Sequence, residues 1–251
     1  MSARPALEIA VTSPAGARAA RGSGADRVEL CAALELGGLT PSAALVEAVA
    51  AEGLPVQALV RCRPGDFVHD AEELALMAAE VRSVIASGAA GVVIGALTAD
   101  GALDTDAVAR LADAARAANR PVEVTLHRAV DQSADPVAAA ALLPSLGLTR
   151  VLTSGGAPAT ADGLAAITAM VAAAPGVQVM AGGGVRVADI PALARAGVAA
   201  VHLSAKARAP RRPGGTWVPL GAGGASADQD THFVTDAEVV ALARRALDTA
   251  A

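Results

Sequence analysis

Short runs of β-branched and aliphatic residues alternate along the whole chain with longer stretches that are rich in alanine and leucine. The short runs predict eight strands, and the longer amphipathic stretches predict a helix after each of them. The strands are expected at residues 7–11, 27–31, 56–61, 91–95, 122–127, 150–153, 177–181 and 200–204. The helices are expected near residues 14–22, 41–52, 70–87, 104–118, 135–146, 160–173, 186–196 and 235–249. N-cap residues support several helix starts: Thr40-Pro41, Asp135-Pro136, Thr160 and Thr235.

Eight strand–helix units in 251 residues are typical of an α/β fold with a closed parallel (β/α)8 barrel, the TIM barrel. A doubly wound open sheet is the alternative, but the turn after the first strand reads Val11-Thr-Ser-Pro14 and lacks the glycines of a dinucleotide site. We therefore expect a single TIM-barrel domain over residues 1–251 and no nucleotide cofactor. A long irregular loop, rich in proline and glycine, is expected at residues 205–233, after the eighth strand.

The predicted strands have one purely aliphatic face and one face that carries the polar groups. Since barrel strands are buried on both faces, polar residues on them are informative, and the polar face is expected to line the barrel interior. Buried acids and guanidinium groups need partners, so the cluster is either a functional pocket or an interior salt-bridge network. The residues expected to point inward are Glu8, Glu29, Arg61, Glu123, His127, Gln178 and His202.

Glycine and hydroxyl residues follow the sixth, seventh and eighth strands. Backbone amides after the last strands of a barrel commonly bind an anion, although tight turns also require glycine. The only lysine of the chain, Lys206, adds positive charge at this position. The residues predicted to bind an anion are Ser154, Gly155, Gly182, Gly183, Gly184, Ser204 and Lys206.

Composition narrows the classes of ligand. A net charge of −5 and an aromatic content of 1% argue against nucleic-acid binding. No long apolar run predicts a membrane span, and two cysteines favour a reducing, cytoplasmic location. Cys31, His127 and His202 are candidate ligands of a metal site. The alternative is that Cys31 is only a small buried hydrophobic residue. His69 and His232 are expected to be solvated loop residues.

Several segments resemble the CutC family, which is named for copper homeostasis. They include Gly24-Ala-Asp-Arg-Val-Glu-Leu-Cys31, Gly37-Gly-Leu-Thr-Pro-Ser42, Gly95-Ala-Leu-Thr-Ala-Asp-Gly101, Thr125-Leu-His-Arg-Ala-Val-Asp131 and His202-Leu-Ser-Ala205. The resemblance implies a cytosolic TIM barrel that self-associates as a homodimer or higher homo-oligomer and handles copper. It also implies that the pocket residues are Glu8, Glu29, Arg61, His127, Arg128, Asp131 and His202.

The chain departs from the family pattern at a few positions. Ala10 stands where a cysteine is common, Cys62 where a proline is usual, and His69 where a tyrosine is usual. The loss of a thiol at position 10 leaves Cys31 as the single cysteine on the predicted inward face.

Two functions follow as hypotheses. The first is a role in copper homeostasis by binding or trafficking the ion. The second is an enzyme of the lyase or isomerase type that acts on a small phosphorylated or anionic metabolite. In the second, His127 and His202 are the acid–base residues and Arg61 clamps the ligand.

Overall fold

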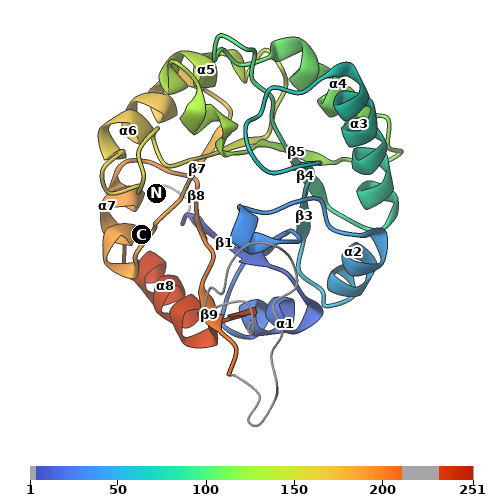
Figure 1. The fold of residues 1–251 in the computed structure, drawn as a ribbon. Helices are drawn as coiled ribbons and strands as arrows, with labels where there is room; N and C mark the ends of the chain where they lie inside the picture. Colours follow the sequence, from blue (N-terminus) through green and yellow to red (C-terminus); the bar gives the residue numbers. More distant parts are fainter. Residues whose placement is uncertain (1–3, 211–231, 251) are drawn as a thin grey trace, which may run out of the picture.

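A computed structural model of the chain describes residues 4–210 and 232–250. Eight parallel strands pair in chain order and close into a barrel, and a helix follows each of them, which confirms the TIM barrel. Figure 1 shows the ring of helices around the barrel, viewed along its axis. The strands are β1 (Ala6–Val11), β2 (Arg27–Leu30), β3 (Val56–Leu59), β4 (Gly91–Ile94), β5 (Glu123–Leu126), β6 (Arg150–Thr153), β7 (Gln178–Gly182) and β8 (Ala200–Leu203).

The helices of the outer ring also lie close to their predicted ranges. They are α1 (Pro14–Gly22), α2 (Ala43–Ala50), α3 (Ala71–Ala86), α4 (Thr105–Arg116), α5 (Pro136–Leu142), α6 (Leu164–Ala173), α7 (Ile190–Arg195) and α8 (Ala237–Ala250). Three short 3-10 turns precede α2, α5 and α7: η1 (Leu34–Leu36), η2 (Arg128–Gln132) and η3 (Val187–Asp189).

Some boundaries differ from the predicted ones for local reasons. Strand β3 ends at Leu59 because the backbone of Arg61 exchanges hydrogen bonds with Thr40 instead of a neighbouring strand. Ser42, rather than Thr40, caps α2 through a bond from the Leu45 amide. Helix α8 begins after Asp236, whose carboxylate accepts from the first-turn amides.

The segment after β8 is more regular than expected. Strand β9 (Lys206–Arg208) pairs antiparallel with β10 (Phe233–Thr235), so the prediction of an irregular loop is wrong at both of its ends. Runs of three residues are too short to show a strand period in sequence. Residues 211–231 of the predicted loop lie outside the described residues.

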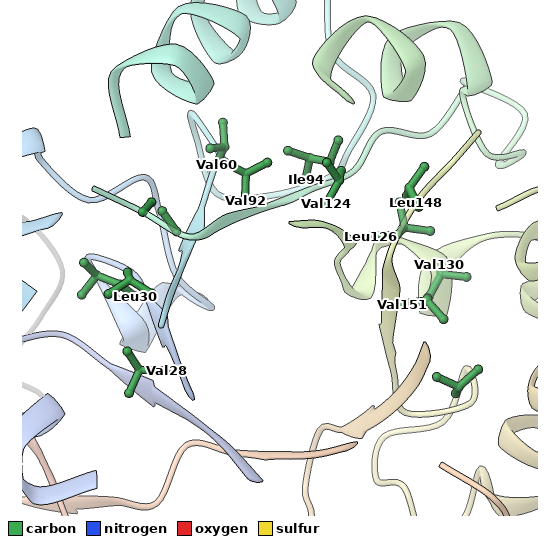
Figure 2. Close-up of a cluster of buried hydrophobic side chains, with 14 of the residues drawn as sticks. Val28, Leu30, Val60, Val92, Ile94, Val124, Leu126, Val130, Leu148 and Val151 are labelled. Atoms are coloured by element: carbon green, nitrogen blue, oxygen red, sulfur yellow. The ribbon is translucent and has the colours of Figure 1, made fainter. Parts of the chain in front are cut away.

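The aliphatic face of the strands forms the main core between the barrel and the helices. Figure 2 shows 14 of these buried side chains, and those it labels include Val28, Leu30, Ile94 and Leu126. The opposite face carries the polar residues, so alternation along each strand sends one set to the core and the other into the barrel.

Candidate functional site

The polar side chains inside the barrel fall into two groups, of which the first closes its amino-terminal end. Arg150 is fully buried and donates to Gln178 Oε1 (3.0 Å), Thr125 Oγ1 (3.1 Å) and Glu123 Oε2 (3.3 Å). Gln57 Nε2 donates to the same Glu123 oxygen at 2.7 Å. Glu123 and Gln178 therefore join a hydrogen-bond network around Arg150, which was the structural interpretation of their pattern. They are not buried as expected, because they stand at the first position of their strands, where the Glu123 side chain is 42% exposed and Gln178 is exposed.

The second group lies nearer the carboxyl ends of the strands and is centred on Glu8. The parallel register places Glu8 opposite Arg27 on β2 and opposite His202 on β8. Its carboxylate accepts a short bond from Arg27 Nε and a 2.9 Å bond from His202 Nδ1. Burial would raise the pKa of Glu8, but the His202 hydrogen bond and the Arg27 charge outweigh it and lower the pKa to about 2. Glu8 is thus a fixed negative charge.

Glu29 and His202 form a buried carboxyl–imidazole pair. His202 Nε2 lies 3.7 Å from Glu29 Oε2, and both residues are buried. Burial raises the pKa of Glu29 to about 7 against the opposing charge of His202, and the charge of Glu8 adds to the rise. Burial lowers the pKa of His202, but the carboxylates of Glu29 and Glu8 outweigh it and raise that pKa. Glu29 is therefore placed to titrate near neutral pH, and His202 holds its proton to a higher pH than an ordinary imidazole.

This pair opens into a cavity of about 140 Å³ at the mouth of the barrel. Its polar wall brings together five of the predicted pocket residues and one predicted anion ligand: Glu29, Arg61, His127, Arg128, His202 and Ser204. Phe67, Leu59 and Leu152 supply apolar wall. Glu8 lies beneath the cavity, in contact with His202.

His127 is a neutral donor in this wall. Its Nδ1 accepts from the Ala129 amide at 3.1 Å, so the proton of the neutral ring is on Nε2. Burial and the charge of Arg61 lower the pKa of His127 to about 3. Nε2 is buried and has no hydrogen-bond partner among the described residues. The ring is therefore suited to donate to a ligand oxygen, more than to act as a general acid that ionises near neutral pH.

Arg61 is held by the loops that surround the mouth. Its guanidinium donates to the carbonyls of Leu36 (3.1 Å), Gly38 (3.2 Å) and Gly65 (2.9 Å) and lies 5.1 Å from the centre of the Phe67 ring. The expectation of a carboxylate partner is not met, because carbonyl oxygens compensate this charge instead. These three bonds use three of the five N–H groups, and Nε is buried without a partner among the described residues, so Arg61 keeps donors for a ligand.

Asp131 holds Arg128 in place. Its carboxylate accepts from Arg128 Nε (2.7 Å), Thr153 Oγ1 (2.6 Å), Gly156 N (3.1 Å) and both N and Oγ of Ser154. Arg128 also donates to Ser154 Oγ at 2.8 Å. These bonds use the amide and hydroxyl of Ser154, and the Gly155 amide donates to Thr153 Oγ1. The donors predicted after β6 thus orient Arg128.

The other predicted anion ligands line a second cavity of about 340 Å³ beside the first. Its wall includes Arg128, Gly183, Gly184, Ser204 and Lys206, and it shares Arg128, His202 and Ser204 with the mouth cavity. Gly183 and Gly184 have φ values of 109° and 62°, a region that favours glycine. A Cβ on Gly183 would lie 2.7 Å from the Arg128 guanidinium carbon, so any other residue here would displace the arginine from this position. Gly182 lies outside this wall, at the end of β7 against Leu152 and His202.

Comparison with known proteins identifies the family. The model of the CutC family matches residues 6–207. The chain belongs to the CutC family. A CutC family protein of Klebsiella pneumoniae is 44% identical over 214 residues, which cover 85% of this chain and 81% of the relative. A CutC family protein of Sinorhizobium medicae is 41% identical over 206 residues, 81% of this chain and 82% of that relative.

A solved CutC structure supports the same assignment. The structure described as the copper homeostasis protein CutC of Streptococcus agalactiae matches with a TM-score of 0.72 at 26% identity. The match covers 80% of this chain and 98% of the other. Among the residues described for this CutC family member, no helix has the length and apolar character that a membrane crossing requires.

Two groups of side chains in the described part of this CutC family member have the spacing of metal ligands. One is Glu8, Glu29 and His202, and the other is Cys62, His69 and Glu73. Cys31 and His127 belong to neither group, so their assignment as ligands stays a prediction. Cys31 packs against Leu59 and Val93, and burial raises the pKa of its thiol.

Sequence reasoning missed two residues that the structure joins to the polar groups of the barrel, Arg27 and Arg150. Arg27 has the same strand parity as Glu29, which could have revealed it, and Arg150 opens β6. The expectation that His69 is solvated is wrong, because its side chain is fully buried in the loop before α3. The turn residues around it gave no periodic signal. His232 is exposed, as expected.

Proposed function

We propose that the barrel mouth binds a small phosphorylated or carboxylated metabolite and moves a proton on it, as lyases and isomerases do. The observation that carries the proposal is the Glu29–His202 pair, which shares one cavity with the guanidinium groups of Arg61 and Arg128. An acid–base pair beside fixed cations is the arrangement that proton transfer next to an anionic group requires.

In this proposal each of the two adjoining cavities has one role. The second cavity, of about 340 Å³, would hold the anionic group through Arg128, Lys206 and the turn at Gly183 and Gly184. The mouth cavity would be the place where Glu29 and His202 exchange the proton. The Nε2–H group of His127 would donate to an oxygen on which negative charge develops.

The anion half of the proposal is tested on Lys206, because a single lysine gives a single side-chain signal in a lysine-labelled NMR sample. We expect inorganic phosphate or sulfate to shift that signal in a saturable way. Arg128→Ala should weaken the response at least about tenfold, whereas Arg82→Ala on the exposed face of α3 should leave it unchanged. A Lys206 signal that no anion moves, or an Arg128→Ala response equal to that of the parent, would overturn anion binding at this place.

The proton-transfer half is tested by hydrogen exchange. Small phosphorylated aldehydes and ketones are incubated with the protein in D2O, and incorporation of deuterium next to the carbonyl group is followed by NMR. Glu29→Gln and His202→Asn should abolish the exchange while phosphate still shifts the Lys206 signal. Exchange that survives both substitutions would refute the role of the pair.

A role in copper homeostasis is the second candidate, and one observation favours it. Ligand atoms of Glu8, Glu29 and His202 all lie within 4.8 Å of one another, and carboxylate with imidazole suits a divalent ion such as Cu2+. The Streptococcus agalactiae relative is described as a copper homeostasis protein.

The copper candidate predicts stoichiometric Cu2+ binding with imidazole nitrogen coordination in electron paramagnetic resonance. His202→Asn should remove the nitrogen coupling. His232 is exposed and belongs to neither group of ligand-type residues, so His232→Asn should leave the coupling unchanged. Nitrogen coupling that persists in His202→Asn would reject this site for copper.

A further inference from the structure

A second cluster of ligand-type side chains lies outside the barrel interior, on the segment that joins β3 to α3. Cys62 follows Arg61 after the end of β3, and His69 and Glu73 flank the start of α3. Cys62 and His69 are two of the positions at which the chain departs from the family pattern. The cluster is therefore not one that the family resemblance implies.

The start of α3 fixes the carboxylate of this cluster. Asp70 caps the helix, and the Glu73 carboxylate returns to accept from the Asp70 amide at 3.2 Å. Arg63 Nε makes a short bond to the other oxygen, Oε1. That hydrogen bond, together with those from the Asp70 amide and His69, lowers the pKa of Glu73 to about 2 against a smaller effect of burial. The carboxylate is therefore ionised, and Oε2 is turned towards His69.

The imidazole of His69 is buried, and only one of its two ring nitrogens has a hydrogen-bond partner among the described residues. Its side chain has an exposed fraction of 0%, and Nδ1 lies 3.3 Å from Glu73 Oε2. Nε2 is buried with no hydrogen-bond partner among the described residues. A buried ring nitrogen without a partner costs free energy in the folded state unless a further group binds it.

The thiol completes a set of sulfur, nitrogen and oxygen ligands. One ligand atom from each of Cys62, His69 and Glu73 lies within 4.8 Å of the other two. In a tetrahedral site with bonds of about 2.0 to 2.3 Å, ligand atoms are about 3.3 to 3.8 Å apart, so closure requires movements of roughly 1 Å.

We propose that Cys62, His69 and Glu73 form a binding site for a thiophilic d10 metal ion, Zn2+ or Cu+. Thiolate and imidazole ligands select these ions over Mg2+ and Ca2+. Three protein ligands leave a fourth position open to water or to an exogenous ligand. The site adjoins the mouth without sharing its ligands, because Arg61 precedes Cys62 and Phe67 stands two residues before His69.

Cobalt titration of the reduced full-length protein tests the site, since thiolate coordination to Co2+ gives a charge-transfer band and a tetrahedral site gives intense d–d bands. We expect one equivalent of Co2+, displaced by Zn2+. Cys62→Ser should abolish the charge-transfer band and weaken Zn2+ binding at least about 100-fold, as measured by competition with a chromophoric chelator. His69→Gln should weaken it similarly.

The chain supplies a matched control, because it holds only one other cysteine. Cys31→Ala should keep the band, and so should His202→Asn, which removes a ligand of the other metal-type group. A band that survives in Cys62→Ser, or that is lost in Cys31→Ala while that variant remains folded by circular dichroism, would overturn the site. Glu73→Gln separates the two ions: Zn2+ binding should fall, while Cu+, which binds well to sulfur and nitrogen alone, should be less affected.

Discussion

Four buried ionisable side chains at the barrel mouth have pKa values that their surroundings move in opposite directions. Glu8 and Glu29 are both acids in the same interior, yet partners hold one ionised while burial keeps the other protonated up to near-neutral pH. His127 and His202 differ in the same way, because only His202 faces carboxylates. Such pairs with separated pKa values are how one site supplies both an acid and a base.

The raised pKa of Glu29 predicts a dependence of stability on pH. A carboxyl whose pKa is about 7 when folded and about 4.5 when unfolded binds more protons in the folded state, so its contribution is complete below pH 4.5 and is lost as the pH rises through 7. Glu29→Gln removes this loss. Relative to the parent, its free energy of unfolding should therefore rise by at most about 3 kcal/mol between pH 4.5 and 8. Urea denaturation across that range measures the difference.

A difference between Glu29→Gln and the parent that is independent of pH would contradict the raised pKa. The 13C carboxyl shift of Glu29 provides a direct check, because it should titrate near pH 7, well above the range of an ordinary glutamate.

Strand parity predicted the residues of the mouth but not their electrostatic roles. Alternation alone identified Glu8, Glu29 and His202 as inward-facing residues. The direction of each pKa depends on which strands become neighbours, and the partner of Glu8 on β8 is 194 residues away in sequence. Arg27 was missed because it stands at the first position of its strand, where the apolar run begins.

At the scale of elements, the loops at the carboxyl ends of the strands are organised by single acceptors. Asp131, in η2 after β5, binds the end of β6 through Thr153, Ser154 and Gly156. It joins two successive strand–helix units and orients Arg128 between them. Its side chain is 6% exposed, so water cannot replace it as an acceptor.

Asp131→Ala should therefore lower the free energy of unfolding by about 3 kcal/mol, because several buried donors lose their acceptor together. Asp135→Ala is a suitable comparison, since this carboxylate accepts from two amides as the N-cap of α5 and is exposed. Its loss should cost about 1 kcal/mol. Chemical denaturation of the two variants measures both values, and equal losses would show that Asp131 is only a local cap.

The elements themselves were predictable wherever their signals are local. The range of α1 and the N-cap Asp135 agree with the sequence because proline, capping residues and helical spacing lie within a few positions of one another. The ribbon of β9 and β10 was not predictable. Its strands are three residues long and pair Lys206 with Thr235, so nothing short-range marks them.

At the scale of the whole molecule, the barrel interior has a structural end and a ligand end. The amino-terminal end is closed by Arg150 and its hydrogen-bond partners, where a TIM barrel usually has aliphatic layers. The carboxyl end holds the cavities that Arg128 and His202 line. Polar residues on the inward-facing positions of the strands thus stabilise the fold at the amino-terminal end of the barrel. At the carboxyl end, residues on the same face are available to a ligand.

Substitution of one arginine at each end separates the two roles. Arg150→Met keeps apolar bulk but leaves Glu123 and Gln178 without their shared donor. It should lower the free energy of unfolding by about 2 to 3 kcal/mol while phosphate still shifts the Lys206 signal. Arg128 has a side chain that is 42% exposed, so Arg128→Ala should cost about 1 kcal/mol or less and yet weaken the phosphate response at least about tenfold. If both variants lost stability and phosphate binding in parallel, the interior would act as a single cooperative network, and the division between the two ends would be wrong.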